Sequence, residues 1–392
     1  MTGALDRWPA WPEFTIGKGE SEEDLVKIKA AILAHYGAEN LQKSWIKVCQ
    51  KLEEVTQEIK DRGSQITPAI NFKDLDSLSH EQKQNLKDIG CFVIKEVIDR
   101  EKAEERFKDL KYTSDNQSNV SGWPAESPSI LNLFYTPTQV AARSHPNMLK
   151  VTQELINLWH DDTSNEPLEP LSYTDAVRNL NMYDLSVRKD AETRLFPGTA
   201  HCGTFWAFQG WTSITTTSPG EGSILLYPNV KWSIAYVLLR PFFKAPEDPK
   251  DIMDPTKWTL DPDMPWFPGT FRANSQMLSL EWHPHLKLRD FPPIAPGATV
   301  WWHADMCHVV DTEHKGQGDS SVLCIAATPS TKSNNEYVER QLKELIGGRL
   351  PPDFQAPGRV DSKEPSFMGY TGEAGILSTE GRKAMGIRVY FL

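Results

Sequence analysis

The stretch PGATVWWHADMCHVV, residues 296–310, decides how this chain folds. Its segment ATVWWHA follows a Pro-Gly pair and is rich in β-branched and aromatic residues, which predicts a strand. Other short apolar segments (GTFWAFQGWTSITTT, GSILLYPNV and SSVLCIAAT) lie between Gly, Pro and Asp from about residue 170 to 330. Strands at this spacing predict a β-sandwich or a barrel.

Helical patterns flank this β-rich region on both sides. Residues 1–165 form a mainly helical region, with apolar residues spaced at three and four in NLQKSWIKVCQKLEEVTQEIKDRG. A short strand, GCFVIKEVI, interrupts it, and the polar stretch from Tyr112 to Glu126 is predicted to be a loop. Residues 166–330 form the β core. Residues 331–392 return to a helix, NNEYVERQLKELIGG, and then to coil. We expect one integrated domain, because the helices must pack on the core.

Composition excludes several classes of protein. The net charge of −11 argues against nucleic-acid binding, which needs a surplus of Lys and Arg. No apolar stretch approaches the roughly twenty residues that span a bilayer, and the N-terminus shows no secretory signal. The five cysteines are scattered and odd in number, which favours reduced thiols and a cytoplasmic location. The sequence does not indicate the oligomeric state.

Histidine and aspartate recur at spacings that suggest a metal site. A 2-His-1-carboxylate iron site takes a His and an Asp two apart on one strand and a second His from another strand. His303, Asp305 and His308 offer three such ligands within six residues, although such ligands normally converge from separate strands. The other candidates are each more typical of structural roles: His160-Asp161, His201-Cys202 and His283-Pro284-His285.

Four long motifs resemble a known family. They are FYTPTQVAARSHPNML (134–149), FQGWTSITTTSPGEGSILLYPNV (208–230), LLRPFF (238–243) and PGATVWWHADMCHVVDTEHKGQGDSSVLCIAATPST (296–331). The chain is similar to the uncharacterised fungal and bacterial proteins grouped by fold with the iron/2-oxoglutarate-dependent oxygenases. This resemblance implies an α+β fold: a double-stranded β-helix, or jelly-roll, with helices packed around it.

The chain departs from this family where the metal ligands belong. The resemblance implies an H-x-D pair that supplies two iron ligands, but no H-x-D occurs between about residues 179 and 203. His308 matches the third ligand, and Trp206 stands where the family tends to have an arginine. One imidazole cannot hold Fe(II) usefully. We therefore expect neither a metal nor another cofactor.

These observations favour a metal-independent enzyme acting on a small hydrophobic molecule. The expected reaction is a non-redox cyclisation or isomerisation, such as an intramolecular [4+2] closure. The resemblance to fungal proteins implies a terpenoid or polyketide of fungal secondary metabolism as its substrate. Alternation places Trp206 and Phe208 on one strand face. The expected catalytic residues are His308, His303, Asp305 and Gln209, and the expected substrate-binding residues are Phe205, Trp206, Phe208, Trp211, Tyr227, Trp302, Tyr183 and Arg188.

Two alternatives stay open from the sequence. One is an active oxygenase that uses Fe(II) and 2-oxoglutarate, with His303, Asp305 and His308 as metal ligands. The other is a non-catalytic pseudoenzyme that binds a small molecule or stabilises a partner oxygenase. Thirteen tryptophans fit either an aromatic pocket or ordinary core filling.

Overall fold

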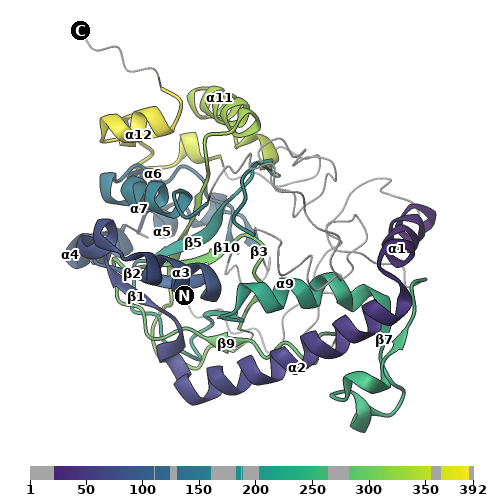
Figure 1. Cartoon of the computed structure of the whole chain (residues 1–392). Coiled ribbons are helices and arrows are strands. Elements are labelled where there is room, and N and C mark those ends of the chain that lie inside the picture. Colours follow the sequence, from purple (N-terminus) through teal and green to yellow (C-terminus); the bar gives the residue numbers. More distant parts are fainter. Residues whose placement is uncertain are drawn as a thin grey trace.

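The fold is a mixed α+β arrangement in which helices surround small β-sheets (Figure 1). The computed structural model describes residues 22–109, 111–123, 130–159, 182–186, 188, 203–263, 282–311, 313–354 and 363–387. The helices are α1 (Glu22–Tyr36), α2 (Ala38–Arg62), α3 (His80–Ile89), α4 (Arg100–Lys108), α5 (Lys111–Asp115), α6 (Pro137–Arg143), α7 (Pro146–Ile156), α9 (Val230–Leu239), α11 (Lys332–Ile346) and α12 (Thr379–Ala384).

The strands are short, and five of them (β2, β5, β6, β10 and β12) lie in segments that the sequence predicts as strands. They are β1 (Ala69–Asn71), β2 (Cys91–Lys95), β3 (Gly122–Trp123), β4 (Ile130–Leu131), β5 (Phe208–Ser213), β6 (Ile224–Leu226), β7 (Phe243–Lys244), β8 (Thr259–Leu260), β9 (Arg289–Asp290), β10 (Thr299–His303), β11 (His308–Val310) and β12 (Val322–Ala327). The predicted loop from Tyr112 to Glu126 is wrong in part, because α5 overlaps its first residues and β3 lies within it.

Two sheets form the centre of the molecule. A five-stranded sheet has the order β1-β2-β10-β5-β12, and a three-stranded sheet has the order β11-β6-β9. The described strands do not close into a barrel, so the mixed α+β class is confirmed while the jelly-roll remains a prediction. Strands β1 and β2 come from the mainly helical N-terminal region, which is thus built into the central sheet.

Strand β10 lies inside the five-stranded sheet and is buried at all five positions. Because successive side chains of a strand point to opposite faces, β10 divides its residues between two cores. Val300 and Trp302 join one core, here called the inner core, which also holds residues of β6, α2 and α9. Trp301 joins a second core, the outer core, which holds residues of α7. The strand is therefore covered on both faces.

Helix α2 carries the apolar stripe that the sequence predicts and lies beside α9 (Figure 1). Its Trp45 stacks on Phe243, with ring centroids 4.8 Å apart. Arg240 lies in the same region and is 2% exposed. The guanidinium carbon of Arg240 is 4.6 Å from the centre of the Trp258 ring, and Arg240 Nε donates to the carbonyl oxygen of Trp282. The LLRPFF motif thus holds a buried cation against aromatic rings.

His285 is packed into this aromatic region and is 4% exposed. Its ring lies 5.5 Å from that of Trp258 and 5.9 Å from that of Tyr236. Burial lowers the pKa of His285 to about 4. His283-Pro284-His285 therefore contributes a buried neutral imidazole to the core.

Within the described part of the chain, no helix has both the length and the apolar character needed to cross a membrane.

His285 should make the stability of the fold depend on pH. The folded pKa of about 4 lies below the ordinary value of 6.5, so the unfolded chain binds the extra proton as the pH falls. This histidine should remove about 2 kcal/mol of unfolding free energy between pH 7 and pH 5. Urea unfolding of His285→Gln should show a pH dependence smaller by that amount. The same change at the exposed His80 is the matched control and should leave the pH dependence of the unfolding free energy as it is in the native protein. If His285→Gln and the native protein showed the same pH dependence, His285 would not be its source.

Candidate functional site

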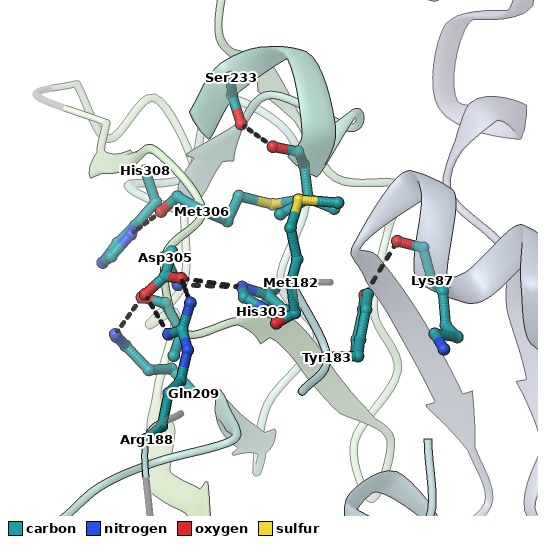
Figure 2. A network of polar contacts seen from close by, with 12 residues as sticks. Lys87, Met182, Tyr183, Arg188, Gln209, Ser233, His303, Asp305, Met306 and His308 are labelled. Carbon is teal, nitrogen blue, oxygen red and sulfur yellow. Dashed lines mark hydrogen bonds and ion pairs between the residues drawn. The ribbon is translucent and has the colours of Figure 1, made fainter. Parts of the chain in front are cut away.

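The candidate site surrounds the turn that joins β10 to β11, residues 303–308. The strand ends at His303, and the amide of Met306 donates to the carbonyl oxygen of His303 over 2.9 Å, which closes the turn. Strand β11 begins at His308. The predicted residues His303, Asp305 and His308 therefore lie at the start, middle and end of one turn (Figure 2).

His303 is fully buried and has both ring nitrogens engaged. Its Nδ1 accepts the Asp305 amide hydrogen over 3.1 Å, so Nε2 carries the ring hydrogen and donates to the carbonyl oxygen of Met182 over 2.9 Å. The ring also stacks on Trp159 at 5.0 Å. Burial lowers the pKa of His303 and keeps it neutral. His303 thus fixes the turn to two neighbouring segments.

Asp305 is paired with Arg188 through two parallel contacts. Arg188 Nη1 lies 3.0 Å from Oδ1 of Asp305, and Nη2 lies 2.5 Å from Oδ2. Burial alone would raise the pKa of the Asp305 carboxyl, but the hydrogen bonds and charge of Arg188 hold it below its ordinary value. Both side chains are partly exposed, so the pair lies at the edge of the site. Arg188 also lies over the Trp159 ring, 5.4 Å from its centre.

Tyr183 closes the side of the site behind His303. Its hydroxyl donates to the carbonyl oxygen of Lys87 over 2.9 Å, and the two rings of Tyr183 and His303 meet edge to face at 4.9 Å (Figure 2). Burial raises the pKa of Tyr183 well above its ordinary value, so the phenol stays protonated. Tyr183 supports His303.

His308 differs from His303 because only one of its nitrogens is engaged. A carbonyl can only accept, so Nδ1 of His308 carries the hydrogen and donates to Met306 over 2.8 Å. Nε2 keeps its lone pair and has no hydrogen-bond partner among the described residues. His308 is exposed to solvent, but protein atoms also surround its ring. These atoms make the charged form less favourable and so lower the pKa of His308. His308 is therefore a neutral imidazole with one available acceptor atom.

Trp302 lies next to His308 on the inner face of the large sheet, and Gln209 lies beside Trp302. They are directly paired across β10 and β5, which puts their side chains on the same face. The Trp302 ring lies 5.4 Å from that of His308, and its indole nitrogen is buried without a partner among the described residues. Gln209 is half-buried, and its Nε2 donates to the carbonyl oxygen of Ala304 over 3.4 Å. No described residue accepts the second hydrogen of this amide.

The predicted aromatic residues do not line a single space. Phe205 and Phe208 belong to the outer core, whereas Trp211, Tyr227 and Trp302 belong to the inner core. Alternation along β5 explains this division, since Phe208 and Trp211 point to opposite faces. Tyr227 donates to the carbonyl oxygen of Leu52 in α2, which is a structural contact.

The expectation that Trp206 shares a strand face with Phe208 is wrong. Strand β5 begins only at Phe208, and Trp206 lies in the preceding segment. There its indole nitrogen donates to Thr204 Oγ1 over 2.5 Å. The Trp206 side chain is partly buried.

His303, Asp305 and His308 do not have the geometry of a metal site. Both nitrogens of His303 bind the main chain and Asp305 binds Arg188, so only His308 has a ligand atom available. Among the described residues, no group of three His, Cys, Asp or Glu side chains is arranged to hold a metal ion. His160, Asp161, His201 and Cys202, named from the sequence, lie outside the described residues.

The main partners of the site could not be named from sequence alone. The acceptors for His303 and Gln209 are main-chain carbonyls of Met182 and Ala304, which carry no side-chain signature. Trp159, which follows α7 and stacks on His303, is distant in the chain. An aromatic residue at the end of an amphipathic helix gives no sign of such a contact.

Comparison with known proteins gives a family match over most of the chain. The family model described as Gig2-like matches residues 21–182 and 177–387. The Escherichia coli K12 protein named "Uncharacterized protein YbiU" is 24% identical over 393 residues, which cover 84% of this chain and 88% of that protein.

Solved structures share the fold. The structure of GlcNAc Inducible Gene 2 from Candida albicans has a TM-score of 0.77 and 22% identity, and the match covers 96% of this chain and 92% of that one. A structure from Salmonella typhimurium LT2 named "Putative Oxidoreductase" has a TM-score of 0.72 and 22% identity, with 95% and 100% of the two chains covered.

His303 should stabilise the turn rather than react. His303→Phe keeps an aromatic ring against Trp159 but removes both hydrogen bonds, which leaves the Asp305 amide and the Met182 carbonyl unpaired. The unfolding free energy should fall by about 2–3 kcal/mol, measured by urea denaturation at pH 7. The same change at the exposed His314 serves as the control. If His303→Phe were as stable as the control, the two contacts would not hold the turn.

Proposed function

Starting from the match over residues 21–182 and 177–387, which shows that the chain belongs to the Gig2-like family, we propose that it is an enzyme acting by acid–base chemistry on a small, largely apolar molecule. The reaction is a non-redox isomerisation or cyclisation of a substrate that carries a carbonyl group. His308 is its proton acceptor. The observation that carries this proposal is the available lone pair on Nε2 of His308, beside Trp302.

The state of His308 suits a general base. An efficient base is neutral at the working pH and has a conjugate acid that can return the proton. Burial lowers the pKa of His308, so the neutral form dominates near pH 7. The bond from Nδ1 to Met306 fixes the ring and leaves Nε2 as the reactive atom.

Two neighbours supply what such a step needs besides the base. The Gln209 amide offers a hydrogen to a carbonyl oxygen on which negative charge develops, and such donors lower the barrier electrostatically. The Trp302 ring offers an apolar wall against which a flat substrate can lie. In the proposed step the substrate carries a C=C bond one carbon away from the carbonyl. His308 removes a proton from the carbon between the two groups, negative charge develops on the carbonyl oxygen, and His308 returns the proton to the far carbon of the C=C bond, which moves that bond next to the carbonyl.

The described residues do not fit a resident iron. Of the three candidate ligands, His303 and Asp305 are occupied by protein partners. For this reason the proposed step runs through the chain's own side chains.

An oxidoreductase is the second candidate, and one observation favours it. A structure that shares the fold carries the name "Putative Oxidoreductase", although at 22% identity this likeness concerns the fold alone. On this alternative, the enzyme would consume 2-oxoglutarate and release succinate only with added Fe(II).

Proton exchange can test the base directly. In D₂O, the enzyme should place deuterium next to the carbonyl of at least one member of a panel of apolar ketones and dienones, followed by NMR. Exchange should persist in EDTA and without oxygen. His308→Gln should slow it by about 10²-fold or more, the range expected for loss of a general base. The native rate should fall as the pH drops below the pKa of His308, because the protonated ring has no lone pair.

Two controls separate the candidates. His314→Gln, at an exposed histidine, should exchange at the native rate. Succinate production from 2-oxoglutarate that requires Fe(II), together with no exchange in EDTA, would replace the acid–base proposal with the oxidoreductase.

A further inference from the structure

A cavity of about 220 Å³ lies beside the small sheet. It is bounded by the C-terminal end of α2 and the segment after it, by β6, and by β9 and the residue after it. The lining residues are Ile59, Gly63, Ser64, Ile66, Thr67, Cys91, Pro219, Leu226, Pro228, Arg289, Asp290 and Phe291. Its walls are mainly apolar, and the polar side chains of the lining are those of Ser64, Thr67, Arg289 and Asp290.

The two charged residues of the cavity lining, Arg289 and Asp290, both lie on β9. Arg289 is paired directly with Leu226, a buried residue of the cavity wall, so the two side chains share a face of the sheet. Asp290 is paired with Leu225 and also belongs to the cavity lining. Burial and the nearby charge of Asp311 raise the pKa of the Asp290 carboxyl, which favours its neutral form, while the charge of Arg289 acts in the other direction. Of the two charged residues in the lining, Arg289 is the one that can hold an anionic ligand.

Arg289 has the character of a ligand-binding arginine. No described residue forms a hydrogen bond or a close ion pair with its guanidinium, although its charge acts on the neighbouring Asp290 carboxyl and lowers the pKa of that group. A guanidinium presents parallel N–H groups that match a carboxylate. Ser64 and Thr67 add hydroxyl groups to the same lining, while Ile59, Ile66 and Phe291 add apolar surface.

We propose that this cavity is a second binding site, which takes a small carboxylate with an apolar body. The carboxylate binds Arg289, and the apolar body lies against Leu226 and Phe291. The volume is below the range of about 300–1,000 Å³ that holds drug-sized ligands, so the occupant has about one ring and a short chain.

The proposal does not depend on the reaction proposed at His308. His308 is also paired with Leu226, so Arg289 and His308 flank the same residue from opposite sides on one sheet face. Two strand spacings separate them, about 10 Å. A ligand in the cavity is thus near the candidate site but does not occupy it.

Binding of 3-phenylpropanoate tests the proposal, with 3-phenylpropanamide and phenethylamine as probes that lack the negative charge. Calorimetric titration of the full chain should show that the carboxylate binds at least about tenfold more tightly than either. Arg289→Gln should weaken this binding at least about tenfold, whereas Arg100→Gln, an exposed arginine on α4, should not. Ser64→Trp places a large side chain at the cavity from an exposed position, so it should fold and reduce binding as well.

Three results would overturn the proposal. They are no binding of the carboxylate to the native chain, equal or tighter binding of the amine, and unchanged affinity in Arg289→Gln. The assay needs no turnover, and His308→Gln should bind the carboxylate with native affinity. Failure here is therefore distinct from failure of the proposed reaction.

Discussion

The burial of β10 on both faces is the constraint on which the rest of the structure depends. All five residues from Thr299 to His303 are buried, and two of them are tryptophans. Each of these large side chains must be covered by apolar partners, because burying them supplies much of the favourable free energy of folding. Helix α7 covers the outer face, while α2, α9 and the three-stranded sheet cover the inner face. The arrangement of the helices follows from this need.

The alternation of side chains between the two faces of the sheet also gives the two histidines of the turn different roles. His303 continues the outer face, so it enters a closed aromatic environment among Trp159, Tyr183 and Phe208, where both nitrogens need partners. His308 starts β11 and lies beside Trp302 on the inner side, where only one nitrogen is engaged. Two residues of one type, five positions apart, therefore have different chemistry because the chain turns between them.

Sequence alone predicted the main strands of the central sheets and singled out His303, Asp305 and His308 as candidates, but it did not predict their partners in the structure. Alternation and β-branched composition locate β10 and β12, and helical spacing locates α2 and α11. The pairing of Asp305 with Arg188 and the contact of Tyr183 with His303 join segments more than a hundred residues apart. Such contacts depend on tertiary packing, which local patterns do not encode. The expected common aromatic pocket was inferred from residue type, whereas strand faces decide which aromatic residues meet.

Gly210 shows how closely β5 and β10, the two strands that carry Gln209 and Trp302, depend on each other. A Cβ atom at Gly210 would lie 2.5 Å from the Trp301 ring and 2.6 Å from the carbonyl oxygen of Val300, so any side chain there would displace β10. With glycine, Trp301 packs directly over β5 on the outer face. The neighbouring pair, Gln209 and Trp302, is then held in register on the inner face. The F-Q-G-W and W-W-H segments thus form one unit, in which a close approach on the outer face positions the polar groups on the inner face.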